Sequence, residues 1–210
     1  MLPHATALYD TAALRTLERR ATQALGDEHA LMQRAGQAAW RCLLQHWPQA
    51  RDIVVACGPG NNGGDGYVLA THALAAGRHV RVLRLAAHAP RSEQAREAHA
   101  AFERAGGRVD SFAGSLPEAD VVVDALFGIG LARAPDPETA ALIAAINGGT
   151  APVLALDVPS GVDADRGGIP GIAVRATFTL QFIAPHPGLS TGAALDHVGS
   201  CELAVLDLDP

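Results

Sequence analysis

The order of apolar and polar positions along the chain predicts two helices followed by alternating strands and helices. Residues 10–25 place leucine and alanine at helical spacing after a cap at Asp10 or Thr11, and residues 28–47 do the same up to Pro48. Continuous apolar runs, typical of strands buried on both faces, then alternate with helical segments. The segments predicted to contain strands are 52–57, 79–86, 108–112, 119–128, 151–161, 176–185 and 201–208, and the helices between them are 67–76, 92–107 and 137–149.

This alternation predicts one α/β domain over residues 1–210, with a largely parallel sheet and helices on both of its faces. The length suits a single domain, and a chain of this size buries a core without disulfides or structural metals. The two opening helices are expected to pack against the sheet or against a second subunit.

Composition and charge narrow the class of protein. Hydrophobic residues make up 49% of the chain, and the formal net charge is −6, with arginine as the only strongly basic residue and no basic block. This disfavours a nucleic-acid partner. Cys42, Cys57 and Cys201 are far apart and are predicted to be reduced core thiols. The first residues lack a secretory signal and no apolar run is long enough for a bilayer, so we expect a cytoplasmic protein without membrane contact.

Four polar loops indicate where the chemistry should lie. Open parallel sheets bind ligands beyond the carboxyl ends of their strands. Loops rich in glycine, proline and polar residues follow predicted strands at 58–66, 124–130, 157–161 and 184–188. Their convergence on one edge of the sheet predicts a binding site.

The first of these loops reads GPGNNGGDG, and it matches the G-x-G-x-x-G pattern at Gly58, Gly60 and Gly63. The acidic residue that normally follows about twenty positions later in dinucleotide-binding proteins is missing, since that segment reads RVLRLAAHAP. An arginine there could instead meet a phosphate. An ordinary NAD-dependent oxidoreductase is therefore disfavoured, also because the chain has no second domain for a substrate.

The polar residues of these loops allow two interpretations each. Asn61 and Asn62 suit a tight turn and Asp65 suits a helix N-cap, but their oxygens are also the hard ligands that cations prefer. Asp124 and Asp157 each end an apolar strand, where they either cap their loops or form an oxygen-rich pocket with Asn62 and the nearby Ser160. A nucleophilic serine is disfavoured, because Val-Pro-Ser-Gly-Val does not match G-x-S-x-G.

Four motifs in this order, GPGNNGGDGYVLA, VVDALFGIGL, LDVPSGVDADRG and APHPGL, resemble the YjeF N-terminal domain family of NAD(P)H-hydrate epimerases. LMQRAG and HVGSCELAVLDL fit the family too. The resemblance implies a three-layer α/β/α Rossmann-like fold, often dimeric, with a bound K⁺ ion. Such an enzyme interconverts the R- and S-forms of hydrated NADH and NADPH (NADHX and NADPHX), so that a dehydratase can repair both. In this family the dehydratase is often fused after this domain, so the resemblance also allows a longer natural chain.

Matched motif by motif, the resemblance assigns roles to residues of this chain. The implied K⁺ ligands are Asn62, Asp124 and Ser160. The implied substrate contacts are Asn61, Asn62, Gly63, Gly64, Asp65, Gly128, Ile129, Gly130, Leu131, Ala132, Arg133, Ala134 and Asp157. Asp157 would touch the hydrated nicotinamide, and we predict that it is the catalytic acid/base.

His186 departs from the family, which commonly has lysine at this position. Histidine titrates near neutrality and could replace lysine in proton transfer, or it merely lines the loop between Pro185 and Pro187. The main alternative to an enzyme is a non-catalytic ligand-binding or scaffold protein that has kept the fold. The presence of Asp157 and both asparagines favours the enzyme.

Overall fold

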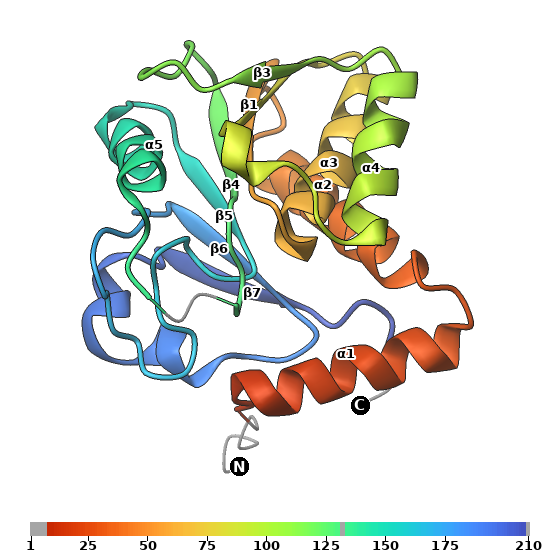
Figure 1. Cartoon of the computed structure of the whole chain (residues 1–210), viewed down its shortest axis with the longest axis vertical. Helices are drawn as coiled ribbons and strands as arrows, with labels where there is room; N and C mark the ends of the chain where they lie inside the picture. The colour runs from red at the N-terminus through yellow and green to blue at the C-terminus, as the bar shows by residue number, and fades with distance from the viewer. Residues whose placement is uncertain (1–7, 131–132, 209–210) are drawn as a thin grey trace.

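One seven-stranded sheet forms the centre of the computed structural model, which describes residues 8–130 and 133–208 (Figure 1). All six neighbouring pairs of strands are parallel, in the order β3-β2-β1-β4-β5-β6-β7. The prediction of a parallel sheet is therefore confirmed. The strands are β1 (Asp52–Cys57), β2 (His79–Arg84), β3 (Val109–Ser111), β4 (Val121–Ala125), β5 (Val153–Leu156), β6 (Phe178–Phe182) and β7 (Ser200–Ala204).

Helices cover both faces of this sheet, as predicted. Figure 1 shows α2, α3 and α4 together on one side and α5 on the other, which makes three layers. α1 lies outside these layers, along the lower side of the view, and it packs against α2. The helices are α1 (Thr11–Leu25), α2 (Ala30–His46), α3 (Asn61–Ala75), α4 (Glu93–Arg104) and α5 (Pro137–Gly148), and the short 3-10 helices are η1 (Ala86–His88), η2 (Pro187–Ser190) and η3 (Gly192–Asp196).

The alternation of side chains along the central strands divides the core in two. In β1, Ile53 and Val55 pack beneath α2, α3 and α4, whereas Val54 and Ala56 pack beneath α5. β4 repeats this pattern, and both strands are buried on both faces, as their continuous apolar runs predict. Because β1 and β4 lie side by side while the chain turns to opposite sides after them, their carboxyl ends form the point at which such sheets bind ligands.

The glycine-rich segment differs from the prediction, because α3 begins at Asn61 and not near residue 67. Gly60 is the N-cap, so the N-cap predicted at Asp65 is wrong, and no residue of 58–66 has a positive φ, so the tight turn is wrong as well. Close packing requires glycine at Gly58 and Gly63. A Cβ on Gly58 would lie 1.7 Å from the Leu126 carbonyl oxygen, and one on Gly63 would lie 2.0 Å from the Gly58 carbonyl oxygen.

Two further observations concern exposure and hydropathy. Cys42 and Cys57 are buried, but Cys201 is exposed on the edge strand β7, so its assignment to the core is wrong. Among the helices of residues 8–130 and 133–208, none has the length and apolar character required to cross a membrane.

Candidate functional site

A cavity of about 680 Å³ opens at the carboxyl ends of β1, β4 and β5. Six parts of the chain line it: α1, the loop after β1 with the start of α3, the loop after β2, the segment after β4, the tip of β5 and the tip of β6. The loop after β2 is held against the loop after β1 by a hydrogen bond from the Arg91 amide to the Pro59 carbonyl oxygen (2.9 Å). The edge predicted from the four loops thus carries a real cavity.

Asp124 and Ser160 are buried, and hydrogen bonds between them connect the loops that follow β4 and β5. The Ser160 hydroxyl donates to Asp124 Oδ1 (2.7 Å), and the Ser160 amide donates to Asp124 Oδ2 (2.8 Å). The Leu126 amide also donates to Asp124 Oδ1 (3.2 Å). Burial raises the pKa of Asp124 to about 6, although the bonds from Ser160 and Leu126 act in the opposite direction. Capping and a ligand role are therefore compatible, since Asp124 Oδ2 accepts one bond and has a further lone pair.

Asp157 stands at the tip of β5 with its carboxylate reaching the cavity. Its backbone is left-handed (φ +66°), a conformation that aspartate tolerates better than most residues. Asp157 Oδ2 accepts a bond from the Ile129 amide (3.1 Å), and Asp157 Oδ1 lies 2.8 Å from His186 Nε2. These contacts fix the carboxylate while leaving it 15% exposed at the cavity.

His186 is more than a lining residue of its loop. Its side chain is 1% exposed, and its amide donates to the Gln181 side chain (2.9 Å). With Nε2 directed at Asp157, the remaining ring nitrogen, Nδ1, is buried without a partner among the described residues. The structure therefore pairs His186 with the predicted acid/base, which supports the interpretation as a proton-transferring or orienting group.

Asn62 has the feature most typical of a missing ligand. Its side chain is buried and lines the cavity, yet neither its oxygen nor its nitrogen has a hydrogen-bond partner in the described parts of the chain. Such orphan amides are rare in native proteins and require a ligand, an ion or water. Asn62 follows β1 and Asp124 ends the adjacent β4, so the amide, carboxylate and hydroxyl oxygens of the implied K⁺ ligands fit a hard cation.

Asn61 and Asp65 differ from Asn62 in their surroundings. The Asn61 side chain accepts a hydrogen bond from the Ser92 hydroxyl (2.7 Å), which ties α3 to the start of α4. Asp65 is buried in the second turn of α3 and lines the cavity. Burial raises the pKa of Asp65 well above its usual range, and the charges of Asp157 and Glu18 raise it further.

Not all predicted substrate contacts reach the cavity. Nine of them line it: Asn61, Asn62, Asp65, Gly128, Ile129, Gly130, Arg133, Ala134 and Asp157. Gly63 and Gly64 do not, because they pack inwards, the latter against Met32. Leu131 and Ala132 lie outside the described residues.

Sequence reasoning missed the wall that α1 contributes. Arg15 and Glu18, one turn apart on this helix, line the same cavity as the strand tips. Burial and the nearby charge of Asp157 raise the pKa of Glu18 to about 7, against the opposing charges of Arg15 and His186. A polar pair on an amphipathic helix normally faces solvent, so only the tertiary arrangement identifies it. His88, Arg91, Asp136 and Phe182, also missed, complete the lining.

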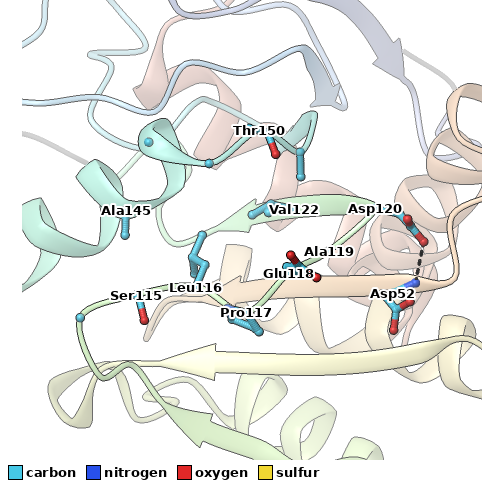
Figure 2. A pocket seen from close by; sticks show the side chains of 14 residues that line it. Asp52, Ser115, Leu116, Pro117, Glu118, Ala119, Asp120, Val122, Ala145 and Thr150 are labelled. Atoms are coloured by element: carbon cyan, nitrogen blue, oxygen red, sulfur yellow. Dashed lines mark hydrogen bonds between the residues drawn. The ribbon is translucent and has the colours of Figure 1, made fainter.

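A second cavity, of about 790 Å³, opens at the opposite edge of the sheet and contains no predicted site residue. Figure 2 shows its wall, formed by the segment around Ser115–Asp120 and the turn after α5. The Asp120 carboxylate in this cavity already accepts hydrogen bonds from the Arg51 amide (2.7 Å) and the Asp52 amide (3.0 Å). The cavity at the carboxyl edge is thus the better candidate for function.

Comparison with known proteins identifies relatives of this chain. The "Bifunctional NAD(P)H-hydrate repair enzyme Nnr" of Escherichia coli is 41% identical over 99% of this chain and 40% of its own length. The "NAD(P)H-hydrate epimerase" of Limosilactobacillus fermentum is 40% identical over 80% of this chain and 81% of its own length. The crystal structure of the yeast protein ynu0, YNL200c, superposes with a TM-score of 0.66 at 25% identity, over 76% of this chain and 72% of that one.

The chain thus spans about two fifths of the bifunctional relative and most of the length of the shorter one. The family model described as YjeF-related protein N-terminus matches residues 28–188, a segment that contains every predicted site residue. The chain belongs to the family of YjeF-related protein N-termini.

Proposed function

We propose that this protein is an isomerase that interconverts the R- and S-epimers of hydrated NADH and NADPH. The observation that carries the proposal is the Asp157 carboxylate, which is fixed by Ile129 and His186 and faces the cavity at the carboxyl edge. The name of the Limosilactobacillus relative, which this chain covers for most of its length, supports the same activity.

The chemistry requires a group with the properties of Asp157. The epimeric carbon carries a hydroxyl and is bonded to the ring nitrogen, so its inversion runs through loss of the hydroxyl to an iminium ion or through ring opening. Either route moves a proton at oxygen, which a positioned carboxylate accelerates. The iminium route also develops positive charge, which a nearby carboxylate stabilises. Asp157 is therefore the proposed acid/base, and His186 Nε2 orients its Oδ1 and exchanges protons with it.

The remaining walls suit the nucleotide part of the substrate. The N-terminus of α3 lines the cavity at Gly60, Asn61 and Asn62, and helix N-termini bind phosphates. A Cβ on Gly60 would meet nothing within 4 Å, so a ligand can approach this backbone closely. Arg91 and Arg133 add positive charge on the same side of the cavity as the segment after β4. We assign the pyrophosphate to this region and the hydrated ring to Asp157.

A potassium ion is part of the proposal, with Asn62, Asp124 and Ser160 as its ligands. It would supply positive charge beside the cavity and satisfy the orphan Asn62 oxygen. The same proposal places the enzyme in the cytoplasm, as a homodimer that works with an NAD(P)HX dehydratase. The bifunctional relatives support the coupling to repair, and exposed Leu203 and Val205, on and after β7, offer apolar surface for a second subunit.

Potassium binding predicts a result for Asn62→Ala. Potassium chloride is expected to raise the melting temperature of the wild-type protein above that in N-methylglucamine chloride of equal ionic strength, because the ion binds only the folded state. The variant is expected to lose this difference, since its ligand oxygen is gone. Differential scanning calorimetry in the two salts measures it. An equal potassium effect in wild type and variant would assign the ion to other residues.

The proposed activity is tested by an epimerisation assay. Pure R-NADHX is mixed with the protein and potassium chloride, and the approach to the epimer mixture is followed by chromatography against a sample without protein. We expect the protein to accelerate this approach. Folded protein that leaves the rate unchanged in the presence of potassium would contradict the proposed function.

A further inference from the structure

Helix α1 holds a charged side chain in a fixed place over the cavity. The Thr11 amide and hydroxyl both donate to Asp165 Oδ1 (2.7 and 2.8 Å), and the Tyr9 amide donates to the Pro185 carbonyl oxygen (3.1 Å). At the other end, Gly26 closes the helix in a left-handed conformation. With Leu14 and Ala21 buried beneath it, α1 presents Glu18 to the same cavity as Asp157.

We propose that Glu18 is a second catalytic residue of this site, an acid–base group that works opposite Asp157 during epimerisation. The inference rests on the proposed function and deepens it. It concerns a residue before the segment matched by the family model, which begins at residue 28.

The position of Glu18 favours a chemical role over a structural one. The Glu18 carboxylate forms no hydrogen bond or ion pair with another residue of the described chain, although Arg15 and Arg19 lie on the same helix. The carboxylates of Asp65 and Asp157 are its electrostatic neighbours. The unpartnered, buried Asn62 amide opens into the same cavity and indicates independently that a polar ligand belongs there.

Crowding of these carboxylates explains why Glu18 can hold a proton at neutral pH. Three acidic groups around one cavity do not all ionise at their usual pH, because each charge opposes the next. The pKa of Glu18, raised to about 7 by burial and by Asp157, places both of its forms at neutral pH, as acid–base catalysis requires. Several charged and titratable groups face Glu18 or line a cavity with it. They are Arg15 and Arg19 of α1, Glu28 before α2, Asp65 of α3, His88 and Arg91 after β2, Arg133 and Asp136 after β4, Asp157 after β5, and His186 after β6.

Inversion of the hydroxylated carbon gives the two groups separate tasks. The Glu18 carboxylic acid transfers its proton to the departing hydroxyl, the C–O bond breaks, water leaves, and the ring-nitrogen lone pair forms the C=N bond of the iminium ion. Water then adds to the opposite face. Its oxygen forms the new C–O bond, Asp157 takes its proton, and the C=N electron pair returns to nitrogen. One proton has moved from Glu18 to Asp157, and exchange with solvent or the reverse reaction restores the starting state.

The test compares Glu18→Gln with Glu118→Gln, an exposed glutamate in the cavity at the opposite edge of the sheet (Figure 2). Wild-type activity on R-NADHX is measured first, and its absence would overturn the proposed function and this inference together. With active wild type, we expect Glu18→Gln to lower kcat about 100-fold with KM nearly unchanged, and to remove one limb of the pH profile between about pH 5 and about pH 9. Glu118→Gln is expected to match wild type. A Glu18→Gln enzyme within about threefold of the wild-type kcat would overturn the inference alone.

A second readout does not depend on turnover. In protein labelled with ¹³C at glutamate carboxyl groups, the signal that disappears in Glu18→Gln belongs to Glu18. This signal is expected to titrate near pH 7 in the wild-type protein and at lower pH in Asp157→Asn, since the opposing charge is removed. Titration at the ordinary pH of a glutamate in both proteins would show that Glu18 does not share the electrostatics of the site, and would overturn the inference.

Discussion

Replacing Asp157 by asparagine is expected to lower kcat for epimerisation by roughly 10²- to 10⁴-fold, the usual contribution of a positioned acid–base group. The amide cannot exchange a proton at the reacting oxygen. It also carries no charge to stabilise the iminium ion. The measurement is the initial rate of conversion of R-NADHX at saturating substrate, with a melting curve of each protein to compare stability.

Asparagine is the informative substitution because of the backbone at this position. Asp157 is left-handed (φ +66°), and asparagine adopts this conformation readily, whereas alanine would strain it. An Asp157→Asn protein that melts like wild type but turns over slowly isolates the chemistry. Asp110→Asn, on the exposed strand β3, is the matched control and is expected to keep full activity. Near-normal turnover of Asp157→Asn would exclude the aspartate as acid/base.

The largest expected effect on stability comes from Gly58→Ala. The added Cβ would lie 1.7 Å from the Leu126 carbonyl oxygen and 2.6 Å from the Leu126 carbonyl carbon. Neither is a flexible side-chain end, so the carboxyl ends of β1 and β4 must move apart. We expect a loss of at least about 3 kcal/mol in the free energy of unfolding, which for a chain of this size lowers the melting temperature by roughly 6 to 12 °C.

Gly60→Ala, two residues along the same motif, provides the control. A Cβ at Gly60 would meet nothing within 4 Å, and its extended backbone (φ −97°, ψ −166°) suits any residue. A loss of at most about 1 kcal/mol is expected, since alanine is a poorer N-cap than glycine. Thermal melting of both variants, each with its chemical denaturation curve, checks the pair. An equal loss of stability in both variants would contradict the distinction between Gly58, which is tightly packed, and Gly60, which is not.

The sheet could be predicted because its signals are local. The runs IVVAC of β1 and VVV of β4 are apolar at every position, and a strand buried on both faces is their simplest explanation. The parallel order of the strands then brings Asp124 and Asp157 to one edge. The start of α3 could not be predicted in this way, because a segment with three glycines in the six positions 61–66 has little intrinsic helix propensity. Its helix depends on contacts with residues far away, such as Ala125, against which Gly66 packs.

Site residues that lie in sequence motifs could be predicted, whereas residues that only the packing brings to the cavity were missed. The structure pairs His186 with Asp157, a contact between residues 29 positions apart, and a role of His186 in proton transfer stays a prediction. Cys201 illustrates the opposite case, since an apolar-looking strand at the edge of a sheet leaves its side chains exposed. Glu18 gives no local signal at all, because its burial and raised pKa arise from the folded arrangement of α1 above the strand tips.

Because α1 lines the cavity, a domain boundary taken from the family model and one taken from the cavity differ by a whole helix. The match to the family model begins at residue 28, whereas the cavity begins with Arg15 and Glu18. A shortened chain starting at residue 28 would retain all seven strands and every motif by which the family is identified. It would nevertheless lack one wall of its cavity, together with the ties from Tyr9 and Thr11 to the loops around Pro185 and Asp165. A boundary chosen from motifs alone would therefore preserve the fold of this domain while removing part of the site that the fold serves.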